Sequence, residues 1–345
     1  MTDKLAVGLW AYGRCAERYV SEGYKENLPF EERIRLLSQL DGVRGVELCY
    51  PYDINRENAR SVAESLRRDG LQIASIITEL ACEAQWQRGS FSSSDPEARE
   101  RSIALVKGSM DVAAEIGVKG VNLWLGQDGF DYVFEADYTA DWDRLVQALR
   151  LCAEYRPDIR LALEYKVSEP RMKCYVGNAG TALSLCLMTG CPNVGVTLDI
   201  GHSFNAGENP ATVAALLASQ NRLFHVHIND NYGIADDDMP AGTVHWPQWF
   251  EFVHWLKRTN YDGWIAVDIY PYRDDPQDAC TASVQFYRLA ERVAEGMRIG
   301  CGSSKSGTLS RLFSLLGWIC GIEQFAHHKK PLYFAFICFC IIFAF

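Results

Sequence analysis

Four side chains that can bind a metal ion stand at the ends of four short apolar segments. The segments read Arg160-Leu-Ala-Leu-Glu164, Val194-Gly-Val-Thr-Leu-Asp199, Leu223-Phe-His-Val-His227 and Trp264-Ile-Ala-Val-Asp268. Each apolar run is typical of a strand buried on both faces, and each ends in a carboxylate or imidazole that is costly to bury alone. If the four strands are parallel, their carboxyl ends meet at one edge. This pattern predicts a metal centre there.

Further acidic and imidazole side chains follow two of these strands. His202 comes three residues after Asp199, across a glycine bend, so the pair could serve two adjacent ions. Asp236 and Asp238 belong to a run of three aspartates, and we expect both to face the same ion if that loop folds back. Oxygen-rich ligands with one imidazole per ion suit Mn²⁺, Mg²⁺ or Co²⁺ better than a structural zinc.

A lysine lies beside the first proposed ligand. Glu164 and Lys166 are two residues apart, so their side chains point to the same side of an extended chain. A carboxylate that holds a cation, next to an ammonium that donates to an oxygen, forms a polarising pair. An isolated pair of this kind is ordinarily a surface ion pair. Because Glu164 ends a strand that is expected to be buried, we favour a functional role for Glu164 and Lys166 over a surface ion pair.

Aromatic residues near the strand ends are candidates for the walls of a binding pocket. Trp10, Trp124 and Phe91 could exclude water and offer flat apolar faces, although ordinary packing in the core explains them equally well. His225 precedes His227 by two residues. We predict that His225 faces the other way and has a structural role.

Eight strand patterns alternate with amphipathic helical patterns, which predicts parallel βα units. The helices are expected over about 29–40, 55–68, 95–116, 141–154, 178–188, 210–218, 247–258 and 281–297, with Asp95 as a cap, Pro96 in the first turn and Gly117 at the end of the third. The strands are expected to begin near Leu5, Arg44, Leu71, Lys119, Arg160, Val194, Leu223 and Trp264.

These units predict a (β/α)8 TIM barrel, a fold of about 250 residues whose active sites lie at the carboxyl ends of the strands. The chain has 345 residues and is 48% hydrophobic, enough for one such barrel. An open doubly wound sheet is the alternative. It would be expected to carry a glycine-rich phosphate loop after the first strand, and Trp10-Ala-Tyr-Gly13-Arg is not one.

The net charge and the cysteines limit the classes of function and the location that we expect for this protein. The chain carries a net charge of −10, and residues 1–300 carry −13, with 30 basic and 43 acidic side chains. Such an acidic body is a poor partner for nucleic acid. Twelve cysteines lack zinc-type spacing and are expected to be buried free thiols. The start, Met1-Thr-Asp-Lys-Leu5, resembles no signal peptide, so we expect a cytoplasmic protein.

The last part of the chain departs from the barrel pattern. We predict a barrel over residues 1–299, followed by a linker and a hydrophobic tail over 300–345 that is atypical of this fold. The terminal run from Pro331 to Phe345 has 15 residues, fewer than the roughly 20 needed to span a bilayer. The open interpretations are a non-native or disordered segment, a membrane anchor, and packing within a homo-oligomer, which we expect the protein to form.

Taken together, these motifs resemble the xylose isomerase-like TIM barrel superfamily over roughly residues 5–298. The closest resemblance is to aldose–ketose sugar isomerases of the rhamnose isomerase type. It rests on E-x-K at 164–166, D-x-x-H at 199–202, H-x-N-D at 227–230 with the following D-D-D, and the aspartate that ends the last strand. Such enzymes interconvert small sugars by a hydride shift assisted by two divalent metal ions, with Mn²⁺ as the expected ion here.

The resemblance implies a role for each matching residue. One ion would be held by Glu164, Asp199, His227 and Asp268, and a second by Asp199, His202, Asp236 and Asp238. Lys166, Asp236 and Asp268 would form the catalytic group, with Lys166 bonded to the carbonyl oxygen of the open-chain sugar. Trp10, Trp124, Lys166 and His202 would contact the substrate.

One feature departs from that pattern, and three alternatives stay open. Relatives commonly offer a histidine on the early strands for ring opening, whereas every histidine here lies at residue 202 or later. Glu79, Glu83 or a water would have to substitute. A ketose 3-epimerase on the same barrel is the first alternative, although such enzymes use two glutamates around one metal. The others are a related DNA-repair endonuclease and a metal-binding barrel without catalysis. No arginine cluster in the sequence marks a phosphate pocket, which favours an unphosphorylated sugar.

Overall fold

Eight parallel strands close into a barrel. The structure, a computed structural model, describes residues 4–169 and 172–296. Each barrel strand pairs with the next one along the chain, and the last pairs with the first, which confirms the predicted (β/α)8 fold. The strands are β1 (Leu5–Gly8), β2 (Gly45–Tyr50), β3 (Gln72–Thr78), β4 (Gly120–Trp124), β6 (Arg160–Glu164), β9 (Val194–Asp199), β10 (Leu223–Ile228) and β11 (Ile265–Val267).

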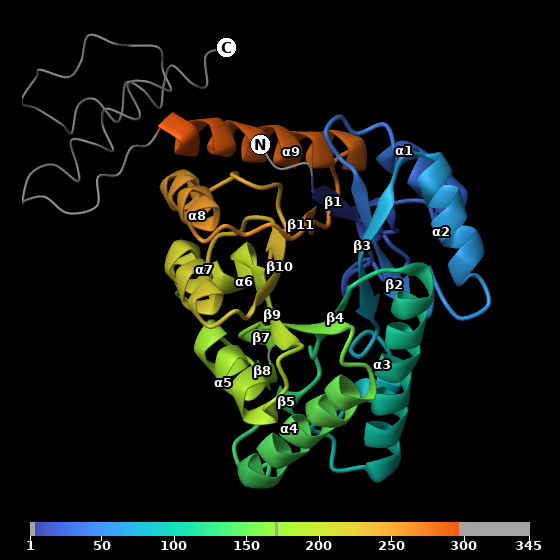
Figure 1. Cartoon of the computed structure of the whole chain (residues 1–345), viewed down its shortest axis with the longest axis vertical. Coiled ribbons are helices and arrows are strands. Elements are labelled where there is room, and N and C mark those ends of the chain that lie inside the picture. The colour runs from blue at the N-terminus through green and yellow to red at the C-terminus, as the bar shows by residue number, and fades with distance from the viewer. Residues whose placement is uncertain (1–3, 170–171, 297–345) are drawn as a thin grey trace, which may run out of the picture.

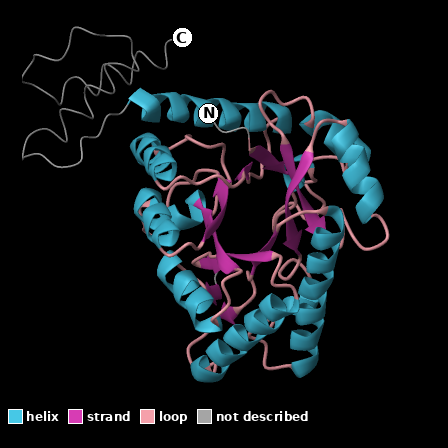
Figure 2. Ribbon diagram, in the orientation of Figure 1, coloured by secondary structure: helices cyan, strands magenta, loops and turns pink. Residues whose placement is uncertain are grey.

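Helices cover the outside of this ring (Figures 1 and 2). The third expected helix has the predicted ends: Asp95 accepts a hydrogen bond from the Glu97 N–H, Pro96 is the first helical residue, and Gly117 ends the helix at a φ of 82°. The helices are α1 (Phe30–Leu37), α2 (Ala59–Arg68), α3 (Pro96–Ile116), α4 (Tyr138–Tyr155), α5 (Ala179–Thr189), α6 (Ile200–Asn205), α7 (Pro210–Ser219), α8 (Trp246–Arg258) and α9 (Pro276–Gly296).

Three very short strands form a small separate sheet beside the barrel. β5 (Gly129–Phe130) pairs antiparallel with β8 (Met172–Cys174), which pairs antiparallel with β7 (Ser168–Glu169). The segment between β6 and β7 carries Lys166, whose backbone N–H donates to the Val176 carbonyl at 3.0 Å. This bond to the segment that follows β8 holds the backbone that presents this lysine.

The described residues hold eight cysteines, all free as predicted; five of them are buried, whereas Cys82 is exposed and Cys49 and Cys174 are half-buried. None of the helices in the described ranges combines the length and the apolar character that crossing a bilayer demands. The predicted boundary at residue 299 and the tail over 300–345 lie outside the described residues.

A chain that ends at Ile299 is expected to fold and bind cations like the full chain, because all eight barrel strands and α9 precede that residue. Removing the apolar terminal run should also reduce association between molecules. Thermal melting and sedimentation of the two chains in parallel measure both effects. If the shorter chain fails to fold, residues 300–345 pack on the barrel and the predicted division is wrong.

Candidate metal centre

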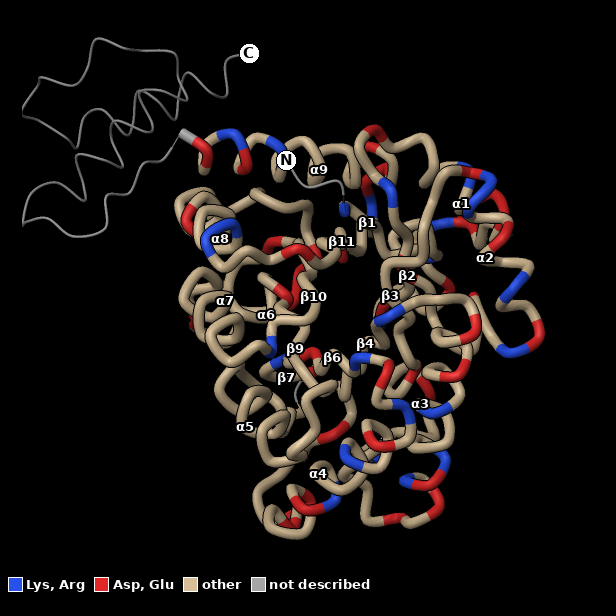
Figure 3. The backbone as a smooth tube through the Cα atoms, in the orientation of Figure 1, with Lys and Arg blue, Asp and Glu red and all other residues tan. Residues whose placement is uncertain are grey.

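The four predicted strand-end ligands meet at one end of the barrel. The ligand atoms of Glu164, Asp199, His227 and Asp268 all lie within 4.8 Å of one another. His227 Nδ1 is the centre of the group, 3.0 Å from Asp268 Oδ2, 3.2 Å from Glu164 Oε1 and 4.0 Å from Asp199 Oδ2. Acidic positions gather along this side of the barrel, beside β9 and β10 (Figure 3). One imidazole nitrogen facing three carboxylates is a donor set that fits a divalent cation.

Neutral donors hold two of these carboxylates in position. Asn122 Nδ2 on β4 donates to Glu164 Oε2 at 2.7 Å. Trp10 Nε1, just after β1, donates to Asp268 Oδ1 at 2.7 Å. In each carboxylate the other oxygen is left facing His227, where a cation would need it. These supporting bonds orient the ligands without adding charge.

Asp199 is held by the turn that follows β9. Its Oδ2 accepts from Asn229 Nδ2 at 2.9 Å, and its Oδ1 accepts from the His202 backbone N–H at 2.8 Å. Gly201 donates its N–H to Asn229 Oδ1, and a Cβ at Gly201 would lie 2.2 Å from that oxygen. Glycine is therefore required for the backbone at position 201 to approach Asn229 this closely. The approach occurs where α6 begins, and this helix brings His202 back over the ligand group.

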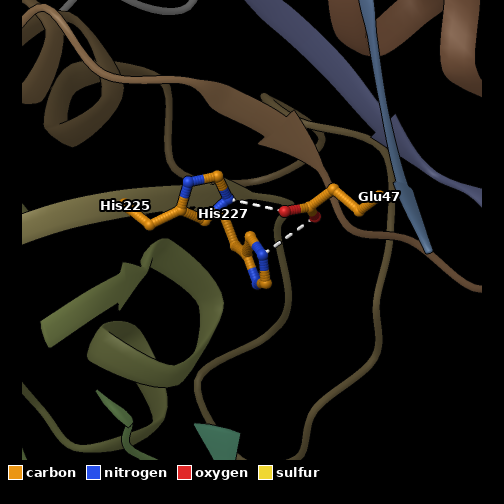
Figure 4. A group of neighbouring side chains, drawn as sticks. All are labelled: Glu47, His225 and His227. Atoms are coloured by element: carbon orange, nitrogen blue, oxygen red, sulfur yellow. Dashed lines mark ion pairs between the residues drawn. The ribbon is translucent and has the colours of Figure 1, made fainter. Parts of the chain in front are cut away.

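A further carboxylate lies on the other side of the His227 ring. Glu47 on β2 is fully buried, with Oε2 at 3.0 Å from His227 Nε2 and Oε1 at 2.7 Å from His225 Nε2 (Figure 4). The prediction that His225 faces away from His227 is therefore wrong. Residues two apart on a strand project to the same side, and both rings point to Glu47. Glu47 was not among the predicted site residues, although a glutamate within an apolar strand could have indicated it.

The second predicted ligand set is only partly brought together. His202 Nε2 lies 3.0 Å from Asp236 Oδ2, and His202 Nδ1 lies 3.4 Å from Glu164 Oε1 and 3.8 Å from Asp199 Oδ1. Asp236 Oδ2 is also 2.9 Å from Lys166 Nζ, so an ammonium already neutralises it. Within the described ranges, Asp199, His202, Asp236 and Asp238 do not converge as closely as the first set.

The loop that carries the three aspartates folds back over the barrel, as expected. Paired backbone bonds of 2.9 and 3.0 Å between Asp230 and Met239 close it. The Asp237 carboxylate accepts the Tyr232 backbone N–H at 3.0 Å and is engaged within the loop, whereas Asp236 reaches the centre. Burial, together with the charges of Asp236 and Asp268, raises the pKa of Asp238 well above its usual range.

Lys166 lies between two carboxylates and an indole ring. Its Nζ contacts Asp236 and Glu169 and lies 5.0 Å from the centroid of the Trp124 ring. Burial alone would lower the pKa of Lys166, but the charges of Asp236 and Glu169 outweigh burial and raise it. The side chain is therefore an ammonium at neutral pH, which makes it a hydrogen-bond donor and excludes it as a base.

The other predicted residues differ in how near the centre they lie. The Trp10 ring contacts the edge of His227 with a centroid separation of 6.4 Å and is a wall of the centre. Phe91 is fully buried in the hydrophobic core, so it packs there and offers no surface to a ligand. Glu79 accepts the backbone N–H groups of residues 81 and 82, and Glu83 contacts a tyrosine hydroxyl and a glutamine amide.

A raised carboxylate pKa and buried polar atoms without hydrogen-bond partners both indicate that the centre suits a cation. Burial raises the pKa of Asp199 to about 7, and the charges of Glu164 and Asp268 contribute to the rise. His202 Nδ1 and Asp236 Oδ1 are buried without a hydrogen-bond partner among the described residues. A divalent ion would neutralise the crowded carboxylates and give such atoms a partner.

The affinity for a divalent cation is expected to rise with pH. Although burial opposes it, the charges of Glu164 and Glu47 raise the pKa of His227 well above its usual range, so the cation-free ring carries a proton that a cation must displace. Each displaced proton should add about one unit to the logarithm of the association constant per pH unit. Calorimetric Mn²⁺ titrations from pH 6 to pH 9 measure this slope, and a flat profile would contradict the assignment of His227 as a ligand.

Comparison with known families agrees with this geometry. The sequence profile described as xylose isomerase-like TIM barrel matches residues 34–290, which is most of the chain. The chain belongs to this family of (β/α)8 barrels, as the motifs predicted.

Several solved structures share the fold. One is L-ribulose 3-epimerase, with a TM-score of 0.68 and 17% identity, covering 87% of this chain and 100% of that chain. Another is D-psicose 3-epimerase from Clostridium cellulolyticum H10 with D-tagatose, with a TM-score of 0.66 and 16% identity, covering 84% and 99%. A third is a xylose isomerase domain protein from Alicyclobacillus acidocaldarius subsp. acidocaldarius, with a TM-score of 0.63 and 18% identity, covering 85% and 99%. At these identities the likeness concerns the fold, and the structural neighbours include both sugar epimerases and an isomerase-type protein.

Proposed function

We propose that this protein is a divalent-cation-dependent aldose–ketose isomerase that acts on a small, unphosphorylated sugar. The observation that carries the proposal is the ammonium of Lys166, which Asp236 and His202 connect to the group formed by Glu164, Asp199, His227 and Asp268. A protein that only bound a metal would need no such donor. Mn²⁺ is the proposed ion because the ligands are oxygens and one imidazole, with Mg²⁺ or Co²⁺ as substitutes.

Each side chain near the proposed cation would have a separate role in the reaction. A bound cation would polarise neighbouring oxygens of an open-chain sugar. Lys166 is placed to donate a hydrogen bond to the oxygen on which negative charge develops, as the donors of an oxyanion hole do. Asp236 has one oxygen engaged by Lys166 and His202 and one without a partner, so it can accept a hydrogen bond from a sugar hydroxyl. Trp10 and Trp124 would exclude water and face the C–H side of the sugar.

A polar cavity of about 840 Å³ is lined by Glu169, the ion-pair partner of Lys166, but by none of the four strand-end ligands. Its walls mix donors and acceptors, which suits a ligand rich in hydroxyl groups. They include three arginines, Arg18, Arg88 and Arg144, of which Arg88 pairs with Glu135 and Arg144 pairs with Asp141.

The proposal is tested with a panel of aldoses and ketoses incubated with the Mn²⁺-loaded protein in D₂O. A hydride shift moves hydrogen between C1 and C2 of the sugar, so the product should carry little solvent deuterium on carbon. Conversion that incorporates deuterium at C3 would contradict the isomerase. The absence of any conversion across the panel would contradict both enzymatic candidates.

A ketose 3-epimerase is the second candidate, because two of the three structures described above are named as 3-epimerases. Two residues favour the isomerase instead. Asp268 stands where such an epimerase is expected to use a second glutamate, and Lys166 has no evident part in epimerisation. The labelling experiment distinguishes the two reactions.

The proposed setting is the cytoplasm, where the free thiols of the described residues would stay reduced. The proposed partner is the sugar itself, and a homo-oligomer remains part of the proposal. Size-exclusion chromatography with light scattering tests the oligomeric state.

A further inference from the structure

The contact between Glu47 and two histidines has no part in the proposed reaction. Glu47, His225 and His227 come from neighbouring positions inside the barrel, on β2 and β10, and all three are buried. Four of their polar atoms have no hydrogen-bond partner among the described residues: both Glu47 oxygens, His225 Nε2 and His227 Nε2. The ion-pair contacts between these atoms are therefore what compensates their burial (Figure 4).

The His227 ring joins this buried group to the metal centre. Its Nε2 faces Glu47 Oε2 at 3.0 Å, and its Nδ1 faces Asp268 and Glu164 at 3.0 and 3.2 Å. An imidazole that keeps its proton on the nitrogen facing a carboxylate carries its lone pair on the other nitrogen. A proton kept on Nε2 by Glu47 would leave Nδ1 as the atom that can bind a cation.

We propose that Glu47 is a positioning residue of the metal centre, whose carboxylate holds the Nε2 side of His227 and so presents Nδ1 to the cation. His225 occupies the second oxygen of Glu47 and prevents that carboxylate from turning away. Carboxylates that hold a ligating histidine from behind in this way orient the ring and make it a better ligand.

A second metal ion bound by Glu47, His225 and His227 is the competing explanation, because their ligand atoms also lie within 4.8 Å of one another. The arrangement of the His227 ring disfavours it. His227 would have to bind two ions through both nitrogens, which requires that the ring lose both of its protons.

The test compares the same substitution at two buried glutamates. Glu47→Gln removes the charge behind His227, whereas Glu291→Gln removes a carboxylate that is 1% exposed and pairs with Arg288 on α9, outside the metal centre. We expect Mn²⁺ binding, measured by calorimetry, to weaken about 10–100-fold in Glu47→Gln and to stay at the wild-type value in Glu291→Gln. Unchanged affinity in Glu47→Gln, or an equal loss in both variants, would overturn the proposal.

The wild-type protein supplies a measurement that needs no variant. Nitrogen-15 spectra of the Zn²⁺-loaded protein should place the proton of His227 on Nε2 and the metal on Nδ1. A metal on Nε2 would overturn the proposal. The proposal would also be overturned if the wild-type chain bound two Mn²⁺ ions and the Glu47→Gln variant bound only one, because Glu47 would then be a metal ligand itself.

The inference depends on the proposed cation but not on the sugar. Cation affinity and ring protonation are measured without turnover. If no sugar is converted but the Glu47→Gln variant binds Mn²⁺ weakly, the positioning role stands while the isomerase proposal fails.

Discussion

Removing the divalent cation is expected to abolish sugar isomerisation, and adding Mn²⁺ or Co²⁺ is expected to restore it. Three carboxylates and an imidazole lie within 4.8 Å of one another, and in the cation-free protein protons must balance their charge. The reaction would then lack the group that polarises the sugar oxygens. A chelator titration with re-addition of Mn²⁺, followed by conversion of the preferred sugar, measures the effect.

The same cation should stabilise the folded barrel. At a concentration about 100 times its dissociation constant, a ligand that binds only the folded state adds about 2.7 kcal/mol. For a domain of this size we expect a rise in the melting temperature on the order of 5 °C. Calorimetric scans with and without Mn²⁺ measure that rise.

Two aspartate variants serve as a matched pair for this prediction. Asp199→Asn should remove most of the rise, because Asp199 belongs to the ligand group. Asp237→Asn should keep it, because the Asp237 carboxylate bonds to a backbone N–H within its own loop. Full activity in thoroughly stripped protein would refute the requirement for a metal.

The sequence was sufficient to predict the barrel and the convergence of four strand-end side chains, for a physical reason. Parallel strands buried on both faces are continuous apolar runs, so a charged residue at the end of a run is conspicuous. Glu164 and Asp199 are the last residues of β6 and β9, and Asp268 directly follows β11. The geometry of a closed parallel barrel then brings these ends together.

Side-chain direction inside the barrel was harder to predict. A strand that is apolar on both sides gives no alternation from which its inner face can be read, and His225 was assigned to the wrong face. The signal was present in the two-residue spacing between His225 and His227 and in the charge of Glu47 within β2. Polar residues in the middle of buried strands, Asn122 among them, support ligands here and were not recognised.

Short irregular segments could not be predicted because tertiary contacts determine them. Helix α6 has six residues and depends on the bonds of Asp199 and Asn229, which lie on different segments. The strands of the small sheet have two or three residues each, too few for any hydrophobic period. These segments nevertheless place His202 and Lys166, so the second ligand set was the least predictable part of the site.

The variant Lys166→Met is expected to lower turnover about 10²–10³-fold while metal binding is retained, since that is the typical cost of removing one preorganised donor. Lys166 is an ammonium at neutral pH because Asp236 and Glu169 raise its pKa. It contacts the loop that carries Asp236 but none of the four strand-end ligands. Steady-state kinetics, with a calorimetric Mn²⁺ titration of the same preparation, separate the two effects.

Two control variants distinguish loss of the donor from loss of the fold. Lys173→Met makes the same change at an exposed lysine on β8 and should leave turnover unchanged. Lys166→Arg keeps the positive charge between Asp236 and Glu169, so it should preserve the melting temperature, yet its planar guanidinium cannot reproduce the position of Nζ and turnover should stay low. If Lys166→Met turns over normally, the isomerase loses its main support, and the epimerase becomes the better account of this barrel.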